Sequence, residues 1–328
     1  MIWNSFQRRF AVEVGEQMKS LVIGAGGFVG AYLIRHLLED ENQTIYATKM
    51  DFESIDVPST VHLTDLDILD KSAVCSLLSA ISPDCIYHLA ALSSVALSWA
   101  QPQKTVDINI KGLINLLDAI RECNLAPRIL LIGSSEEYGA VRPEDLPIKE
   151  DAVLRPKNMY AVTKATQNYI GQIYHEAYQM DIVMARAFNH VGPKQSPQFV
   201  VSDFCRQVAE IEKGRQEPTI RVGNLSAKRD FTDVRDIVRG YKLLTEKGQA
   251  GEVYNIGSSL ALSIEDILHM IISSSSLQIE IEVDKDKLRP VDIPVIRADI
   301  SKIVCTTGWK PLIPIEQTIQ DTLAYWRK

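Results

Sequence analysis

Tyr160 and Lys164 lie four residues apart in "YAVTK" (160–164), a spacing that places both side chains on one face of a helix. A tyrosine exchanges protons near neutral pH only when its pKa is lowered. A neighbouring ammonium stabilises the phenolate, so we expect Lys164 to lower the pKa of the Tyr160 phenol. The pair predicts acid–base catalysis. Because YxxxK is also common in exposed amphipathic helices, this interpretation depends on the surrounding segments.

A second group with chemical potential follows an apolar run in "GSSEEYG" (133–139). Ser134 offers a hydroxyl four residues before Tyr138. Glu136 and Glu137 are adjacent, so we expect their carboxylates to point in different directions, with at most one facing a substrate. If one of them moves protons, the segment indicates a dehydratase. If both are bystanders to the serine, it indicates simple hydride transfer.

Glycines at 24, 27 and 30 in "GAGGFVG" directly follow a strand and open a helix at Phe28 and Val29. Gly24 permits a tight turn, Gly27 lets the backbone approach a pyrophosphate, and Gly30 lets helix and strand pack closely. The free N–H groups at the helix start favour phosphate. With a strand before it and a helix after it, the loop predicts dinucleotide binding rather than a plain turn.

The second strand should select the dinucleotide. An acid at its end would hold the ribose hydroxyls of NAD, whereas a base suits a 2′-phosphate. The strand ends with Thr48 and Lys49, and Asp51 stands too far along. We therefore expect NADP(H) rather than NAD(H), the alternative being a merely solvated Lys49. In "LDI", Asp67 and its neighbour Ile68 are expected near the adenine.

Short apolar strands alternate with helical periodicity over the first 188 residues, the pattern of a doubly wound α/β fold with a parallel (Rossmann) sheet. After residue 188 the sequence becomes rich in loop-forming residues, which indicates a smaller carboxyl-terminal lobe over the edge of the sheet. Ser263 and Asp266 have the spacing of a helix capping box. The expected strands are 20–24, 44–48, 84–90, 128–133, 181–188 and 219–222, and the expected helices 28–40, 71–80, 104–123, 158–179, 199–213 and 233–247.

The composition restricts the function classes. A net charge of −7 argues against a nucleic-acid surface. No apolar run approaches the ~20 residues needed to cross a bilayer, so no membrane association is expected. Five scattered cysteines without metal-ligand spacing indicate a cytoplasmic protein without a metal site. Residues 1–18 read as an amino-terminal extension outside the fold.

Four segments, "GAGGFVG", "HLAA" (88–91), "GSSEEYG" and "YAVTK", stand in the order typical of extended short-chain dehydrogenases/reductases, and together they resemble that family. The resemblance implies a Ser134/Tyr160/Lys164 triad. Ser134 would bind the C4 oxygen of a sugar, Tyr160 would exchange its proton, and Lys164 would also hold the nicotinamide ribose. The implied cofactor contacts include Leu89, Ala90 and Ala91, and the implied substrate contacts include Ser93, Ser134, Ser135 and Glu136.

Two segments of the second half, "RAFNHVGPKQSPQFVVSDF" (186–204) and "VGNLSAKRDFTDVRD" (222–236), look like the family branch acting on GDP-linked deoxyhexoses. That resemblance suggests that Asn189, Arg229 and Arg289 contact the diphosphate, and that the backbone near Val200 and Val222 lines the nucleoside pocket. Arginine suits phosphate because its planar guanidinium is always charged. The alternative is that Arg229 and Arg289 are surface residues of polar loops.

The resemblance is strongest to the 4-keto reductases of that branch, which form GDP-D-rhamnose from GDP-4-keto-6-deoxy-D-mannose. In that reaction Ser134, Tyr160, Lys164 and NADPH suffice, and Glu136 only binds the sugar or positions water. A GDP-mannose 4,6-dehydratase is the first alternative because Glu136 is present. A 4-epimerase is another. A non-catalytic NADP-binding regulator is the rival from a different class, since fold does not fix function.

Two domains are expected, each discontinuous. Residues 19–187 and about 231–257 would bind NADP, and residues about 188–230 and 258–328 would bind the nucleotide sugar. The family resemblance also suggests a homodimer in which the helices near 104–123 and 158–179 form a four-helix bundle. Apolar positions such as Ile110, Leu113, Leu117 and Ile170 could serve equally in the monomer core.

Overall fold

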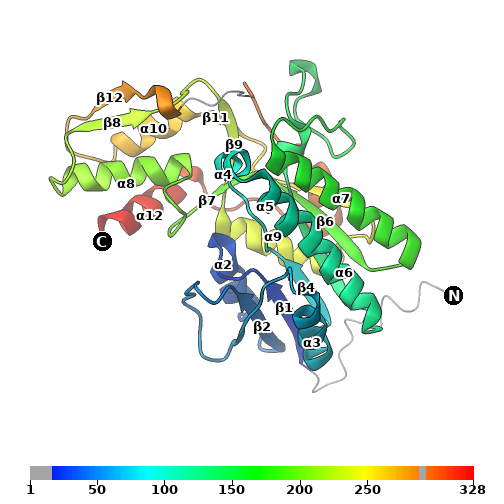
Figure 1. Ribbon diagram of the computed structural model, residues 1–328. Helices are drawn as coiled ribbons and strands as arrows, with labels where there is room; N and C mark the ends of the chain where they lie inside the picture. Colours follow the sequence, from blue (N-terminus) through cyan, green and yellow to red (C-terminus); the bar gives the residue numbers. More distant parts are fainter. Residues whose placement is uncertain (1–16, 288–292) are drawn as a thin grey trace.

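The computed structural model describes residues 17–287 and 293–328. Its centre is a seven-stranded sheet of order β10-β6-β5-β4-β1-β2-β3, in which every neighbouring pair is parallel (Figure 1). The order reverses between β1 and β4, the position at which open α/β sheets bind ligands. The doubly wound fold is confirmed. The strands are β1 (Met18–Ile23), β2 (Gln43–Lys49), β3 (His62–Asp65), β4 (Cys85–His88), β5 (Arg128–Ser134), β6 (Ile182–Ala187) and β10 (Val253–Ile256).

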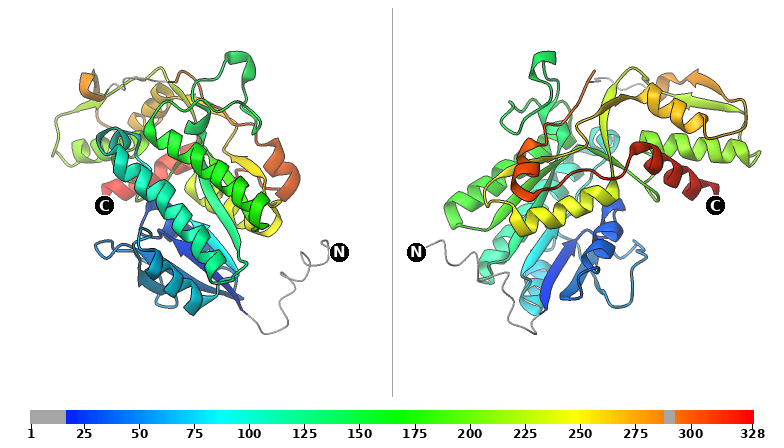
Figure 2. Two further views of the ribbon diagram at one scale, coloured as in Figure 1. Left: turned by 45° about the vertical axis from the view of Figure 1, so that its right-hand side comes forward. Right: turned by 180° about the vertical axis from the view of Figure 1, so that it is seen from behind.

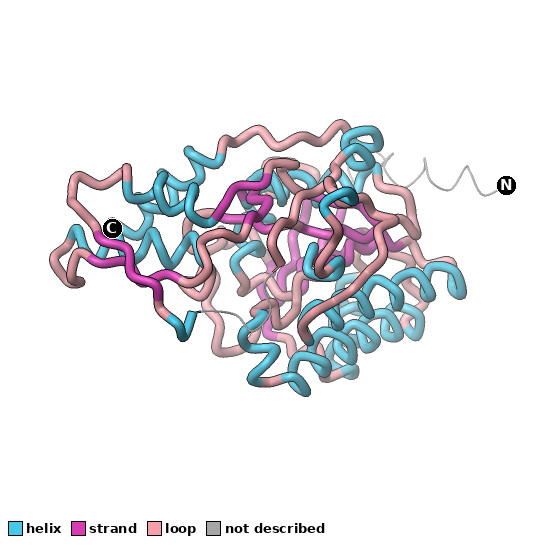
Figure 3. Tube along the Cα trace, turned by 90° about the horizontal axis from the view of Figure 1, so that it is seen from above, coloured by secondary structure: helices cyan, strands magenta, loops and turns pink. Residues whose placement is uncertain are grey.

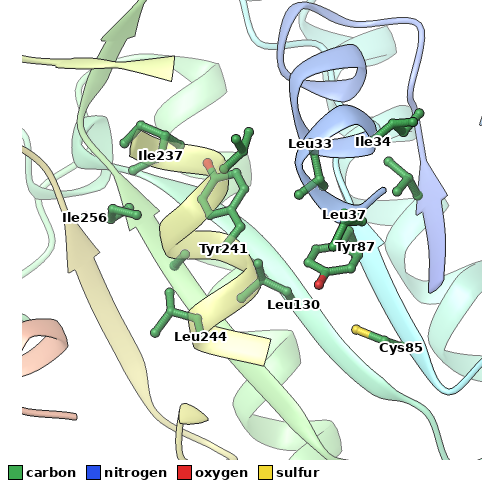
Figure 4. Packing of buried hydrophobic residues seen from close by; sticks show 14 of the residues in the cluster. Leu33, Ile34, Leu37, Cys85, Tyr87, Leu130, Ile237, Tyr241, Leu244 and Ile256 are labelled. Carbon is green, nitrogen blue, oxygen red and sulfur yellow. The ribbon is translucent and has the colours of Figure 1, made fainter. Parts of the chain in front are cut away.

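Helices cover both faces of this sheet. On one face, α2 (Phe28–Leu37) and α9 (Val234–Lys247) bury a cluster that includes Leu33 and Tyr241 against β5 (Figure 4). On the other face lie α3 (Lys71–Ile81), α6 (Gly112–Glu122) and α7 (Met159–Tyr178). The central strands are nearly all apolar because both of their faces are buried, as the sequence indicated.

The helix expected over 104–123 is interrupted. After α4 (Val95–Ala100), the chain forms α5 (Pro102–Val106), a π-helical turn (Asp107–Lys111) and then α6. A π-helical turn places an extra residue in the helix and is frequently found at functional sites. Here the turn contains Asn109, whose side chain is fully buried.

The carboxyl-terminal lobe has its own apolar cluster and projects to one side of the sheet (Figures 2 and 3). The predicted capping box is confirmed, since Ser263 Oγ accepts from Asp266 N at 2.9 Å and Asp266 Oδ2 accepts from Ser263 N at 3.0 Å. The lobe contains α8 (Val200–Glu212), α10 (Ile264–Ile272) and α12 (Ile315–Arg327), with β8 (Thr219–Val222) pairing β12 (Glu280–Val283).

A three-stranded sheet of order β11-β9-β7 was not expected from the sequence. Its central strand is too polar to read as a strand, yet Asp230 within it is 1% exposed. The Asp230 carboxylate accepts hydrogen bonds from the backbone N–H groups of Ser258, Ser259 and Ala298, and these bonds stabilise it in the interior. The remaining elements are β7 (Asn189–Val191), β9 (Lys228–Asp233), β11 (Ala261–Ser263), α11 (Ser301–Thr307) and the 3₁₀ turns η2 (Ser135–Tyr138), η3 (Pro143–Asp145) and η4 (Lys285–Lys287).

The amino-terminal extension predicted over 1–18 lies mostly outside the described residues, and β1 begins at Met18. The discontinuous domain limits stay a proposal. The separate apolar clusters around the parallel sheet and around α8, α10 and α12 support it.

Candidate active site

The glycine-rich loop forms the turn expected of a dinucleotide site. Gly24 has φ +82°, and a Cβ there would lie 2.5 Å from Ala90 Cα. A Cβ on Gly30 would lie 2.2 Å from the Ala25 carbonyl oxygen. At Gly27 the nearest atom would be 3.6 Å away, so this position is open. The residues therefore fit a pyrophosphate cradle, with two glycines packed inward and Gly27 presented outward at the start of α2.

The residues predicted to bind the cofactor around this loop differ in burial and in their hydrogen-bond partners. Thr48 Oγ1 accepts from Gly24 N at 3.2 Å, which fixes the turn to β2. Phe28 stacks on the His190 ring with centroids 6.1 Å apart. Asp67 is exposed and accepts from Leu69 N at 2.9 Å, whereas Ile68 is buried. Of the segment 89–91, Leu89 N donates to Ile23 O at 2.9 Å, so the loop continues directly from the sheet.

Two side chains of opposite charge, Lys49 and Glu53, lie near the end of β2. Lys49 Nζ pairs with Asp65 Oδ1 at 2.6 Å. Glu53, which sequence reasoning missed, accepts from Met50 N at 2.9 Å. A Cβ on Gly26 would lie 2.2 Å from Glu53 Oε2, so this carboxylate lies directly against the glycine-rich loop. Its position four residues past Lys49 hid it from a pattern that examines only the strand end.

The predicted triad is assembled at the carboxyl edge of the sheet. Asn158 caps α7 by accepting from Ala161 N at 2.8 Å, and this places Tyr160 in the first turn and Lys164 in the next. Ser134 ends β5, and its hydroxyl lies near enough to the Tyr160 phenol to lower the pKa of that phenol. All three are buried, at 8%, 9% and 4% exposure for Ser134, Tyr160 and Lys164. The i, i+4 arrangement is as the spacing predicts.

The expectation that Lys164 lowers the pKa of Tyr160 needs correction. Burial dominates and raises the phenol pKa above its usual range, the nearby Ser134 side chain lowers it, and the Glu136 and Glu137 charges raise it. Lys164 Nζ instead donates to Ile132 O at 2.6 Å and to Gln167 Oε1 at 3.2 Å. Burial lowers the pKa of Lys164 itself to about 8. In this state the phenol is protonated, the form that donates a proton.

The two glutamates after Ser134 point in different directions, as predicted. Glu137 is fully buried, and its Oε2 accepts from Arg186 Nε at 2.8 Å. Glu136 is partly exposed and accepts from Asn158 Nδ2 at 3.0 Å. Ser135, expected among the substrate contacts, is 2% exposed. Only Glu136 of the two carboxylates is therefore placed to meet a substrate.

Sequence reasoning also missed residues behind the triad. Asn109 Oδ1 accepts from Leu92 N at 2.8 Å, and its Nδ2 donates to Thr163 Oγ1 at 2.9 Å. It thereby ties the loop after β4, in which Ser93 is exposed, to α7. No signal in the sequence marks the π-helical turn that carries Asn109.

His88 at the end of β4 is 1% exposed. Within the described part of the chain neither of its ring nitrogens has a hydrogen-bond partner. Burial, with a smaller contribution from the Lys164 charge, lowers the pKa of His88 to about 3. The imidazole is therefore neutral beside the lysine. The residue was quoted as part of "HLAA", but its type gave no indication of this burial.

The residues expected to bind the substrate diphosphate are only partly placed. Arg229 lies in strand β9 rather than in a polar loop, because it pairs with Leu262 of β11. It is 7% exposed, and its guanidinium donates to Ile293 O at 2.6 Å. Asn189 begins β7 and is half-buried. Arg289 lies outside the described residues.

The residues expected at the nucleoside pocket lie in the smaller lobe. Val200 is the first residue of α8, and Val222 is the last residue of β8 and fully buried. Across residues 17–287 and 293–328, no group of three His, Cys, Asp or Glu side chains could hold a metal ion. In the same ranges, no helix is long and apolar enough to span a membrane.

Comparison with known proteins identifies this arrangement. A family model described as GDP-mannose 4,6 dehydratase matches residues 21–322. The chain belongs to this family. The comparison confirms the extended short-chain dehydrogenase/reductase resemblance and the predicted enzyme class, an oxidoreductase acting on a nucleotide sugar.

Relatives within the family differ in reaction. The chain is 31% identical to the GDP-6-deoxy-D-mannose reductase of Pseudomonas aeruginosa, over 93% of this chain and 96% of the relative. It is 26% identical to the GDP-mannose 4,6-dehydratase of Yersinia enterocolitica, over 93% of each. A solved structure of RMD from Pseudomonas aeruginosa complexed with NADPH aligns with TM-score 0.82 and 29% identity, over 95% of this chain and 99% of that one.

Proposed function

We propose that the chain reduces the C4 ketone of GDP-4-keto-6-deoxy-D-mannose to give GDP-D-rhamnose. The observation that carries this proposal is the Tyr160 phenol, which is buried together with Ser134 and Lys164 at the carboxyl edge of the sheet. In ketone reduction Tyr160 would be the proton donor to the alkoxide that forms at C4. The 31% identity to a GDP-6-deoxy-D-mannose reductase supports the same choice.

The proposed mechanism uses three side chains. Ser134 Oγ accepts from Glu136 N at 3.2 Å, which leaves its single proton free to polarise the ketone oxygen. A bound reduced nicotinamide would supply the hydride to C4. Tyr160 gives its proton to the oxygen as negative charge develops there. Lys164, charged below a pH of about 8, would hold the nicotinamide ribose, as the family resemblance implies.

The Glu136→Gln variant tests whether the enzyme acts as a reductase or as a dehydratase. We expect ketone reduction within about threefold of wild type, because the proton comes from Tyr160 and the glutamine oxygen can still accept from Asn158. Any residual release of a 4-keto sugar from GDP-mannose should disappear. The measurement is NADPH absorbance with each substrate, combined with chromatography of the products.

A loss of reduction as deep as that of Tyr160→Phe would refute the bystander role of Glu136. Turnover of GDP-mannose to the 4-keto sugar without net cofactor change, and without ketone reduction, would favour the dehydratase. If both substrates stay unchanged, the non-catalytic regulator is favoured.

We propose NADPH as the reductant, since Lys49 stands at the strand end and the Pseudomonas aeruginosa relative was solved with NADPH. Glu53 opposes this choice because its carboxylate lies against Gly26, close to where a 2′-phosphate would lie. We expect Glu53→Gln to tighten NADPH binding about fivefold by removing like-charge repulsion, with NADH binding unchanged or weaker. Titrations of reduced-cofactor fluorescence measure both, with exposed Glu41→Gln as the control. Weaker NADPH binding in Glu53→Gln would contradict this role.

We also propose a homodimer. Exposed apolar side chains follow one stripe of α7, with Val162 38%, Tyr169 54% and Ile173 58% exposed, and Trp99 of α4 is 53% exposed. Leu113 and Leu117 of α6, by contrast, are fully buried in the core of the single chain. A contiguous apolar stripe of this kind marks an interface. Sedimentation velocity at micromolar concentration should give twice the mass of one chain, and Tyr169→Glu should give the single-chain mass. A wild-type monomer would contradict the proposal.

A cytoplasmic location stays a prediction, and all five cysteines are free thiols, as that location requires.

A further inference from the structure

Glu137 is held inside the protein by three donors from three segments. Its Oε1 accepts from Ser134 N at 2.7 Å, and its Oε2 accepts from Arg186 Nε at 2.8 Å. Asn168 Nδ2 of α7 also donates to Oε2. The carboxylate thus connects the end of β5, strand β6 and helix α7 at the point where Ser134 and Tyr160 meet.

Arg186 is itself fixed on its far side. Its Nη1 donates to Tyr138 Oη at 3.0 Å and to Glu150 O at 2.9 Å. The Tyr138 hydroxyl then donates to Asn255 Oδ1 at 2.6 Å, so the network reaches strand β10. With Arg186 at 5% exposure, the guanidinium has little freedom to leave the Glu137 carboxylate.

Burying this ion pair is costly, and stability alone does not explain it. Well-packed apolar side chains often replace a buried ion pair without loss of stability. What apolar residues could not do is accept a hydrogen bond from Ser134 N. That bond sets the backbone from which Ser134 Oγ projects, while the Glu136 amide donates to the same Oγ.

The Glu137 charge also faces the other two members of the triad. It is the opposite charge that raises the pKa of Lys164, against the burial that lowers that pKa to about 8. The Lys164 charge in turn lowers the pKa of His88 of β4, which is buried and neutral. The remaining contacts of the Lys164 ammonium are the uncharged oxygens of Ile132 and Gln167.

We propose that Glu137, clamped by Arg186, is a positioning residue for ketone reduction. It holds Ser134 in place for the ketone oxygen and supplies the buried negative charge that faces Lys164. The inference rests on the proposed function in assigning ketone reduction as the reaction. It separates the two adjacent glutamates by role: Glu136 toward the substrate and Glu137 behind the catalytic serine.

The test compares Glu137→Gln with a matched buried carboxylate elsewhere. Asp236 of α9 is 2% exposed and accepts from Arg239 and from the Leu312 and Ile313 amides, so Asp236→Asn removes a buried charge whose partners among the described residues are not members of the triad. Glu137→Gln should lower kcat by about 30-fold with KM for the sugar within threefold, since positioning rather than binding is lost. The alkaline limb of kcat/KM should move to lower pH, because the pKa of Lys164 loses the charge that raises it. Asp236→Asn should lower Tm without either change.

A second variant covers a failure of Glu137→Gln to fold. Glu137→Asp keeps the charge but withdraws the oxygen from Ser134 N, so it should keep the alkaline limb and still lower kcat. The proposal is overturned if both Glu137 variants retain kcat within threefold. It is equally overturned if Asp236→Asn reproduces the loss of kcat and the altered pH profile.

One measurement needs no turnover and separates this inference from the proposed function. NADPH affinity should weaken as Lys164 deprotonates, if Lys164 holds the nicotinamide ribose as the family resemblance implies. The pH midpoint of NADPH binding should then lie lower in Glu137→Gln than in wild type, whatever sugar the enzyme reduces. An unchanged midpoint overturns the electrostatic role, whereas a wild type that binds NADPH but reduces no ketone overturns only the proposed function.

Discussion

Tyr160→Phe is expected to lower kcat for ketone reduction by about 10³-fold, because a positioned proton donor typically contributes 10²- to 10⁴-fold. The phenol is 9% exposed, so water has little access to replace it. The variant leaves the buried Ser134 hydroxyl in place. Binding of NADPH should stay within about threefold. The measurement is the stopped-time yield of GDP-D-rhamnose, with NADPH affinity determined in parallel.

The matched control for this change lies on the same helix. Tyr169 of α7 is 54% exposed, whereas Tyr160 and Lys164 are buried, so Tyr169→Phe should keep wild-type kcat. A Tyr160→Phe enzyme that retained a tenth or more of wild-type kcat would show that another group delivers the proton, and Glu136 would become the first candidate.

Two glycines of the dinucleotide loop are expected to behave very differently when replaced. Gly24 has φ +82°, and a Cβ there would lie 2.5 Å from Ala90 Cα. Gly24→Val should therefore cost about 3 kcal/mol or more of unfolding free energy, through left-handed backbone strain and overpacking. Chemical denaturation of the purified variant measures this cost. Cofactor binding should be lost with it, because the turn cannot close.

Gly27→Ala is the contrasting case. Its Cβ would meet nothing closer than 3.6 Å, and the residue has an ordinary φ of −73°. Unfolding free energy should change by less than about 1 kcal/mol, whereas NADPH affinity should fall at least tenfold, since the methyl lies where a pyrophosphate must approach. Equal loss of stability in the two variants would contradict the separate roles given to these glycines.

The sequence predicted what is local in this protein. The glycine spacing, the i, i+4 pair on α7 and the Ser263 capping box each depend on residues within one or two turns of one another, and each is confirmed. The near-continuous apolar strands likewise indicated the doubly wound sheet. These features follow from backbone geometry and periodicity, which a single segment carries by itself.

What the sequence did not predict depends on partners far along the chain. Glu137 is buried because Arg186, 49 residues later, neutralises it. Arg229 was expected in a loop, but it pairs in β9 with a strand 33 residues away. The phenol pKa was predicted from one neighbour, whereas burial by the assembled fold proved to be the larger effect. Long-range burial of polar groups leaves no periodic pattern to read.

The most direct measurement uses NADPH carrying deuterium at the transferable position, incubated with GDP-4-keto-6-deoxy-D-mannose. Reduction at C4 predicts one deuterium bound to C4 of the recovered GDP-D-rhamnose, with one NADPH oxidised per sugar. A product without deuterium at C4, or sugar conversion without net loss of NADPH, would contradict the reductase mechanism.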